Sequence, residues 1–241
     1  MESKEYQRMV EAEQRSWWFR GRRRVLDAVI GRLELPGEAS ILDIGCGTGG
    51  NLKMLMRHGR VTAVEFFETA AELAREQAGC EVMRGAAEAL PIRDERFDLI
   101  TMFDVLEHLD DEAPALAEVS RLLAPQGSFF FTVPAFMFLW SGHDVALHHR
   151  RRYRRRDLQQ VLERAGLRVQ WLSYYNAGLF PAVAAVRVAR RLIGGGQSAA
   201  DVAQGEGVVA NALEAFFAAE RHLVGRVPLP FGVSLIGVAR R

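Results

Sequence analysis

Short apolar segments alternate with amphipathic segments along the middle of the chain, and this alternation constrains the fold more than any other feature. Six apolar segments have strand length, at residues 41–44, 61–64, 82–83, 97–103, 128–133 and 167–172. Helical patterns separate them, at residues 50–58, 68–78, 112–123 and 156–165. Strands joined through helices favour crossover connections. The pattern therefore predicts an α/β, doubly wound, mostly parallel sheet with helices on both faces.

Both ends of the chain depart from this alternation. Residues 3–33 favour helix, with a break at Trp17-Trp18-Phe19, and residues 179–193 and 207–223 favour two more helices around a glycine-rich linker at 194–198. A last strand, 233–239, is expected to join the sheet at its edge. We predict a single domain, whose parts are a helical cap at 1–36, a core at 37–175, a helical insertion or lid at 176–231 and the last strand at 232–241.

Composition excludes several classes of protein. The chain has 241 residues, 31 Lys+Arg and 30 Asp+Glu, and this near-neutral balance disfavours a protein that coats nucleic acid. Its two cysteines, Cys46 and Cys80, give neither a disulfide framework nor a metal-binding CxxC spacing, so no metal site is expected. The first 20 residues are too polar for a secretory signal, and no apolar stretch reaches the roughly 18 residues of a membrane span. We expect a cytoplasmic protein.

A glycine-rich turn follows the first strand of the core, with the sequence Ile41-Leu42-Asp43-Ile44-Gly45-Cys46-Gly47-Thr48-Gly49-Gly50-Asn51. Glycines at such a turn let backbone amides approach a ligand closely. Gly45, Gly47 and Gly50 also satisfy the dinucleotide fingerprint, so an NAD-dependent oxidoreductase is one alternative. The carboxylate of Asp43 would repel a pyrophosphate, however, and it suits a cationic ligand that carries an ammonium group.

The stretch from Ile41 to Asn51 resembles motif I of the class I S-adenosylmethionine-dependent methyltransferases, and further segments follow in that family's order. They are Glu65 at the end of the second strand, the loop 85–91, the fourth strand and following loop at 97–109, and the segment 121–128. The resemblance implies a Rossmann-like, seven-stranded sheet with a final antiparallel strand, supplied by Val233 to Ala239. It also implies S-adenosyl-L-methionine as the methyl donor and S-adenosyl-L-homocysteine as a product.

The resemblance further implies the residues that hold this cofactor. The glycine-rich turn would take the methionine end, Glu65 the ribose hydroxyls, and the loop at 85–91 the adenine. Position 86 departs from the family, because Ala stands where Asp is usual; Glu88 is a candidate substitute. The predicted cofactor-binding set is Asp43, Gly45, Cys46, Gly47, Gly49, Asn51, Glu65, Phe66, Ala86, Ala87, Glu88, Phe103, Asp104 and His108. For Cys46 a role as small filler, and for His108 a role in packing, stay open.

The segment 140–153 holds three of the chain's six histidines just beyond the fifth strand, where the mouth of a doubly wound site lies. It resembles the H-D-x-x-x-x-H-x-R-R-Y segment of a type 11/12-like methyltransferase branch, whose members also carry W-W-F near their start. Histidine suits acid–base work near neutral pH. Our hypothesis is that His143 or His148 is the acceptor-side base, that Asp144 orients an imidazole and that Tyr153 contributes a hydroxyl. A hydrogen-bonded structural loop is the alternative.

These observations predict a methyltransferase that acts on a small molecule, at oxygen. Nitrogen or carbon acceptors and a non-catalytic, cofactor-binding relative stay open. The apolar insertion suggests a hydrophobic or lipid-like acceptor with peripheral membrane contact, although core packing also explains it. Residues 1–24 carry seven basic and four acidic groups, and residues 143–157 carry six and two, which suggests an anionic acceptor instead. Nucleic acid is not an expected substrate.

Overall fold

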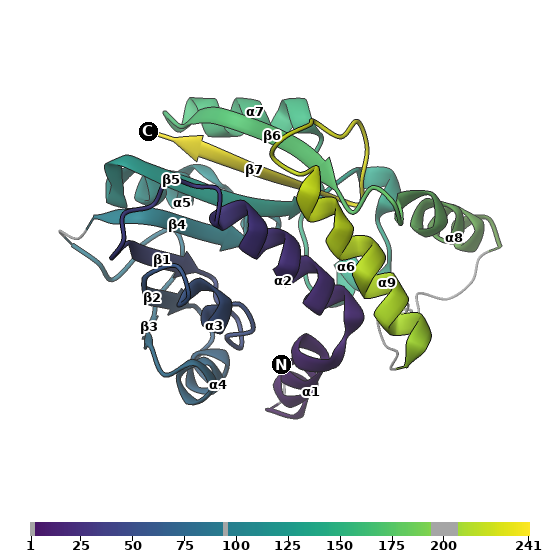
Figure 1. Ribbon diagram of the computed structural model, residues 1–241, viewed down its shortest axis with the longest axis horizontal. Coiled ribbons are helices and arrows are strands. Elements are labelled where there is room, and N and C mark those ends of the chain that lie inside the picture. Colours follow the sequence, from purple (N-terminus) through teal and green to yellow (C-terminus); the bar gives the residue numbers. More distant parts are fainter. Residues whose placement is uncertain (1–2, 94–95, 194–206) are drawn as a thin grey trace.

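The computed structural model describes residues 3–93, 96–193 and 207–241, which build a seven-stranded sheet with helices on both faces (Figure 1). The strand order is β3-β2-β1-β4-β5-β7-β6, and β7 runs antiparallel to both its neighbours. The strands are β1 (Ser40–Ile44), β2 (Arg60–Glu65), β3 (Glu81–Arg84), β4 (Phe97–Phe103), β5 (Leu123–Pro134), β6 (Arg168–Tyr175) and β7 (Ser234–Arg240). The predicted Rossmann-like sheet with a final antiparallel strand is confirmed.

The expected position of the last strand at the sheet edge is wrong. β7 lies between β5 and β6 and pairs with both. Residues Ser234–Ala239 are all buried, whereas the first half of β6 alternates between exposed and half-buried residues. Because a fully apolar strand gains from neighbours on both sides, β7 takes the interior place and β6 forms the edge.

The helices fall where the sequence predicts them, most within one or two residues, except α6, which lies in the segment 140–153 that was expected to be a loop. They are α1 (Ser3–Arg15), α2 (Trp17–Ile30), α3 (Leu52–Leu55), α4 (Glu68–Ala78), α5 (Ala113–Leu122), α6 (Gly142–Ala146), α7 (Arg155–Arg164), α8 (Phe180–Ile193) and α9 (Val208–Ala219), with the 3-10 turns η1 (Leu106–His108), η2 (Met137–Leu139) and η3 (Glu220–His222). The predicted break near Trp17 is real, because the Ser16 hydroxyl accepts a hydrogen bond from Trp18 N and caps α2. α3 is shorter than the predicted 50–58.

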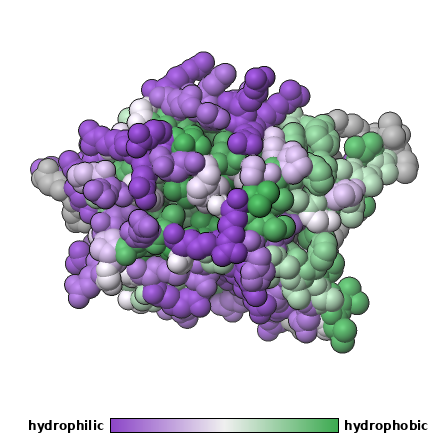
Figure 2. All heavy atoms as spheres, turned by 45° about the horizontal axis from the view of Figure 1, so that its top comes forward, coloured by the Kyte–Doolittle hydropathy of each residue, from purple (hydrophilic) through white to green (hydrophobic). Residues whose placement is uncertain are grey.

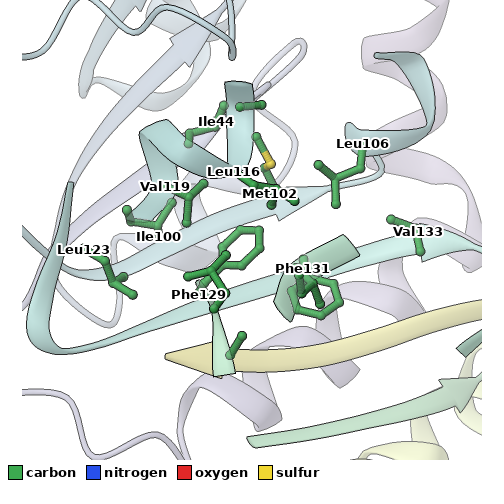
Figure 3. Packing of buried hydrophobic residues seen from close by; sticks show 14 of the residues in the cluster. Ile44, Ile100, Met102, Leu106, Leu116, Val119, Leu123, Phe129, Phe131 and Val133 are labelled. Carbon is green, nitrogen blue, oxygen red and sulfur yellow. The ribbon is translucent and has the colours of Figure 1, made fainter. Parts of the chain in front are cut away.

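Successive residues of the central strands face opposite sides of the sheet, and each side has its own hydrophobic core. Phe129 and Phe131 of β5 pack with Leu116 of α5 on one face (Figure 3). Phe130, which lies between them in the sequence, packs on the other face with Leu26 of α2. This period of two is the pattern of a strand that is buried on both faces.

The helical insertion packs on the N-terminal helices. α9 lies beside α2 (Figure 1). Glu214 of α9 forms ion pairs with Arg20 and Arg24 of α2, and the ring of Phe217 lies 6.4 Å from that of Trp18. The predicted glycine linker at 194–198 lies outside the described residues, so the proposed lid movement stays a prediction. Within the described ranges, no helix combines the length and apolarity needed to cross a membrane.

Candidate active site

The carboxyl ends of β1, β2, β4, β5 and β6 lie along one edge of the sheet, where open α/β folds bind their ligands. Among the described residues, four that are not glycine have left-handed φ angles: Asp104 (59°), Phe136 (58°), His148 (56°) and Asn176 (57°). Asp104 and Asn176 directly follow β4 and β6, and Phe136 follows β5. Such conformations cost about 1–3 kcal/mol each and concentrate at functional sites. The backbone strain therefore marks this edge as the site.

The glycine-rich turn after β1 needs its glycines for two different reasons. Gly45 has a φ of 73°, and a Cβ there would come within 2.5 Å of a Val105 methyl group. Gly47 has a φ of 58°, but no described atom lies within 4 Å of the place that a Cβ would take. Gly45 thus lets the loop after β4 pack against the turn, while Gly47 leaves open space at its surface.

Glu65, the last residue of β2, ties the turn to the neighbouring strand. Its Oε2 accepts a hydrogen bond from Gly47 N at 2.8 Å, and its Oε1 accepts one from Phe67 N at 3.0 Å. A carboxylate has about four acceptor positions, so both oxygens keep lone pairs for further donors. The geometry leaves Glu65 able to accept hydrogen bonds from a pair of hydroxyls.

Asp43 is a buried acid in the middle of the sheet. Its Oδ1 accepts a hydrogen bond from the Thr101 hydroxyl at 2.6 Å. Burial raises the pKa of its carboxyl to about 7, the Thr101 hydrogen bond opposes this, and the nearby Glu65 adds to it. A cation beside Asp43 would restore the charged form.

The other predicted cofactor residues near the turn differ in their surroundings. Burial raises the pKa of the Cys46 thiol far above its usual range, which keeps it neutral and fits the filler role. Asn51 precedes α3, and its side chain makes no capping bond within the described structure. Phe66 is 57% exposed next to Glu65, whereas Phe103 is buried at the end of β4.

The loop at residues 85–91, which is expected to lie beside the adenine, lies next to the end of β2. Gly85 N donates to Glu65 O at 3.0 Å, and Ala86 pairs with Ala89 across a short turn that also holds Ala87. Glu88 is exposed. The hypothesis that Glu88 substitutes for the missing Asp is not tested by this geometry.

Asp104 connects the sheet edge to the N-terminal cap. Its Oδ2 lies 2.7 Å from Nη2 of Arg22, and its Oδ1 accepts a hydrogen bond from the Thr132 hydroxyl at 3.0 Å. Arg22 also donates to Thr132 Oγ1 at 2.9 Å, and its guanidinium lies over the Trp18 ring. No role in the site was predicted for Arg22 from the sequence, although Arg22-Arg23, like Trp17-Trp18-Phe19, matches the branch that carries W-W-F near its start.

The loop between α6 and α7 is organised around Asp144. Its Oδ1 lies 3.0 Å from Nδ1 of His149 and 2.7 Å from Nε of Arg152, and its Oδ2 accepts from Ser141 N at 2.8 Å. Hydrogen bonds from His149 and Arg152 hold the pKa of Asp144 below its usual range despite its burial. The hypothesis paired Asp144 with His143 or His148, but the structure pairs it with His149. Read strictly, the H-D-x-x-x-x-H spacing also ends on His149.

Neither of the two predicted bases forms a hydrogen bond with Asp144 in the described part of the chain, although the ring of His143 lies 6.5 Å from that of His149. His143 and His148 are both exposed, at the start of α6 and just after it. Tyr153 is buried, and its hydroxyl lies 2.6 Å from Glu112 Oε1 and 3.1 Å from Leu106 O. The structure therefore gives the Tyr153 hydroxyl partners within the protein, in place of the predicted contribution to the acceptor.

The arginines of this loop are also paired internally. Arg150 contacts Asp110, Arg151 contacts Glu112 and Arg152 contacts Asp144, at N–O distances of 3.1, 2.7 and 2.7 Å. Carboxylates thus balance half of the six arginines that suggested an anionic acceptor.

Comparison with known proteins places this arrangement in a family. Residues 42–131 match the model of a methyltransferase domain. The chain is 32% identical to a malonyl-[acyl-carrier protein] O-methyltransferase from Enterobacter lignolyticus, over 61% of each chain. It is 33% identical to a glycine/sarcosine/dimethylglycine N-methyltransferase from Actinopolyspora halophila, over 46% of this chain and 21% of that protein. Residues 42–131 are thus a methyltransferase domain, and the chain is similar to class I S-adenosylmethionine-dependent methyltransferases.

A solved structure shares the fold of this chain. The TehB-like S-adenosylmethionine-dependent methyltransferase from Corynebacterium glutamicum superimposes with a TM-score of 0.55 at 17% identity, over 89% of this chain and 86% of that one. At this identity the likeness concerns the fold alone.

The glycine-rich turn fits the cofactor that the resemblance implies. Gly47 leaves open space at the turn, Glu65 keeps acceptor capacity, and Asp43 is a buried acid without a cationic partner among the residues bonded to it. S-adenosylmethionine offers an ammonium group and ribose hydroxyls, which match these acids. The match of residues 42–131 to a methyltransferase domain disfavours the NAD-dependent alternative.

Proposed function

We propose that this chain transfers the methyl group of S-adenosylmethionine to an oxygen of a small, largely apolar acceptor. The observation that carries the proposal is the shared sheet edge. Asp43 and Glu65 lie beside the glycine-rich turn, and the aromatic side chains that follow β5 lie along the same edge. Donor and acceptor would therefore meet over the carboxyl end of β4.

When bound, S-adenosylmethionine supplies a methyl group on a sulfonium centre; the acceptor oxygen bonds that carbon, sulfur keeps the electron pair of the broken bond, and the acceptor proton leaves. The chain's contribution is mainly to hold the two reactants in line, which can supply about 7–11 kcal/mol. Asp43 would hold the ammonium end of the donor, and Glu65 its ribose hydroxyls. The loop after β4, packed against Gly45, would fix the depth at which the acceptor approaches.

An aromatic cluster supports an apolar acceptor. The ring of Phe136 stacks on that of Tyr174 at 4.8 Å and lies 5.3 Å from Phe138. Met137 is 51% exposed and Phe138 is 45% exposed, and Figure 2 shows apolar surface gathering on the side where α8 lies in Figure 1. The internal pairing of Arg150, Arg151 and Arg152 makes an anionic acceptor the weaker alternative.

Oxygen as the acceptor atom rests on the relatives. The Enterobacter relative, which is an O-methyltransferase by name, aligns over more of this chain than the Actinopolyspora N-methyltransferase. The chain spans about 60% of the length of the first and 21% of the second, so neither relative's substrate is carried over. A nitrogen acceptor is the alternative. Within this proposal His143 and His148 are the candidates for the base that removes the acceptor proton.

We include a cytoplasmic location in the proposal. Both cysteines are free thiols, as is usual for proteins of reducing compartments.

Two experiments test the proposed function. Calorimetry should show binding of S-adenosylhomocysteine and none of NAD; tight NAD binding without a response to S-adenosylhomocysteine would overturn the proposal. A screen of metabolite extracts with methyl-labelled S-adenosylmethionine should then show label in apolar alcohols, phenols or acids. Label that appears only in amines would replace oxygen by nitrogen as the acceptor atom. Cofactor binding without any labelled product would favour the alternative that the chain is a non-catalytic relative that only binds the cofactor.

A further inference from the structure

Three side chains with metal-binding atoms gather beside the glycine-rich turn. They are Glu107 and His108 of η1 and His149, which follows α6, and their ligand atoms all lie within 4.8 Å of one another. The backbone N–H of Arg150 donates to Glu107 O at 2.7 Å, so the two loops are tied together at this point. A backbone hydrogen bond therefore holds the loop that carries His149 against the turn that carries Glu107 and His108.

Glu107 is the unusual member of this cluster. Its side chain is fully buried, and neither carboxylate oxygen has a hydrogen-bond partner in another described residue. The nearest nitrogen of an ionisable group is Nε2 of His149, 4.0 Å from Oε1. A buried carboxylate without partners is costly, and such groups are usually satisfied by an ion or water. A bound cation would satisfy both oxygens.

His149 is oriented in the way that metal-binding histidines are. The Asp144 carboxylate can only accept, so the Nδ1 atom of His149, 3.0 Å from Asp144 Oδ1, carries the proton. This tautomer leaves the Nε2 lone pair free on the side of Glu107. A carboxylate that holds the far nitrogen of a ligating imidazole is the usual outer contact of metal sites, and it raises the basicity of the ligand.

The geometry of His108 completes the set. Its ring lies edge-on to that of His149, with centroids 4.7 Å apart and an angle of 89° between the planes. In a tetrahedral site with bonds of about 2.0–2.1 Å, neighbouring ligand atoms lie about 3.3 Å apart. An ion would draw the three side chains together by small rotations. His108 is exposed, which gives an ion a path from solvent.

We propose that Glu107, His108 and His149 bind one divalent transition-metal ion, with Zn²⁺ as the reference ion. Two imidazoles and one carboxylate suit zinc or ferrous iron rather than magnesium, and three protein ligands leave a position open for water or an acceptor oxygen. Val105, whose methyl group packs on Gly45, lies two residues before Glu107, so the ion would lie next to the methyl-donor site. The site replaces the expectation that no metal is bound, and gives His108 a role other than cofactor contact.

Metal titration of the tag-free, chelator-treated chain tests the proposal without cofactor or acceptor. By calorimetry the chain should bind one Zn²⁺, and Mg²⁺ at the same concentration should give no comparable heat. Glu107→Gln, His108→Ala and His149→Ala should each abolish this binding. Asp144→Asn, which keeps the three ligands and alters the outer contact to His149, should weaken it about 10–100-fold.

His148→Ala is the matched control, because this exposed neighbour of His149 lies outside the cluster and its removal should leave Zn²⁺ affinity unchanged. Circular dichroism of each variant separates loss of the site from loss of the fold; Glu107→Gln keeps the side-chain shape and serves if an alanine variant unfolds. No Zn²⁺ binding to the wild-type chain, or equal binding by His148→Ala and His149→Ala, would overturn the proposal.

Discussion

Nη2 of Arg22 lies 2.7 Å from Oδ2 of Asp104, and this contact joins the second helix of the chain to the strained residue that ends β4. The Arg22 side chain is 6% exposed and that of Asp104 is 28% exposed. The N-terminal cap is thus held to the active edge by a largely buried ion pair, and not by apolar packing alone.

Replacing Arg22 by Ala should lower the free energy of unfolding by about 3 kcal/mol, because it leaves the Asp104 carboxylate without its cation. Urea denaturation measures this. Arg24→Ala is the matched control: its side chain is 56% exposed, and Glu214 keeps Arg20 as a partner. The control should cost less than about 1 kcal/mol. Equal losses in the two variants would contradict a special role for the Arg22–Asp104 pair.

Asp43 should make the cofactor-free chain less stable as the pH rises. Its pKa in the folded chain is about 7, above the ordinary value of 3.8. Between these values the folded state keeps a proton that the unfolded state has lost, so stability falls as the pH rises from about 4 to 7 and is then constant. The full effect is on the order of 4 kcal/mol. Asp43→Asn should remove this part of the pH dependence. Urea denaturation of both proteins from about pH 4 to 8 measures the free energy of unfolding at each pH. If the two curves of free energy against pH run parallel, Asp43 is not the cause of the pH dependence.

The raised pKa of Asp43 also predicts how cofactor affinity changes with pH. A carboxylate that holds the ammonium group must first lose its proton, so S-adenosylhomocysteine binding should tighten as the pH rises towards 7 and above. Calorimetry from pH 5.5 to about 8 measures this. Asp43→Asn should bind weakly and lack the trend. A wild-type affinity that is flat over this range would contradict the assignment of Asp43 to the ammonium group.

Gly45→Ala and Gly47→Ala should differ although both glycines have left-handed φ angles. The new methyl group at 45 would collide with Val105, whereas the one at 47 would point into open space. Gly45→Ala should therefore lose more stability, and Val105→Ala should restore part of it. Gly47→Ala should lose only the roughly 1–2 kcal/mol of backbone strain, but its cofactor affinity should fall. Thermal unfolding and calorimetry separate the two effects; failure of Val105→Ala to rescue Gly45→Ala would exclude the collision as the cause.

One of the two exposed histidines near α6 should matter for turnover. Replacing the acceptor-side base by Ala should slow methyl transfer about 10²–10⁴-fold while S-adenosylhomocysteine affinity stays the same. His143→Ala and His148→Ala are compared with each other and with His222→Ala on η3, which lies in a separate element. If turnover is unchanged in both, neither histidine is the base.

The sequence predicted the boundaries of the helices and strands better than it predicted which strands lie next to each other in the sheet. α4 begins and ends where its pattern says, because Gly79 takes the left-handed φ that ends a helix. The edge position expected for β7 was wrong because pairing with β5 and β6 depends on contacts far apart in the sequence. Glu65 was found through a family motif at the end of a strand, where the backbone fixes the side chain.

The acceptor side was less accessible to sequence reasoning. The strict H-D-x-x-x-x-H spacing ends on His149, but it does not say which atoms meet; the folded loop shows that Asp144 bonds the Nδ1 atom of His149. The partner of Tyr153, Glu112, is 41 residues away and has no readable signal. Loops position side chains through such distant contacts, which no local spacing records.

Arg20 and Arg24 of α2 form ion pairs with Glu214 of α9, whereas Arg22 forms one with Asp104 at the sheet edge. The glycine-rich turn and Glu65 come from residues 43–65, whereas the helices that Glu214 joins come from the first thirty residues and from α9. Because the Thr48 hydroxyl of the turn donates to Glu13 of α1, an exchange of the terminal segments between related proteins would also alter the turn. Such an exchange must replace both segments together, because each completes the ion pairs of the other.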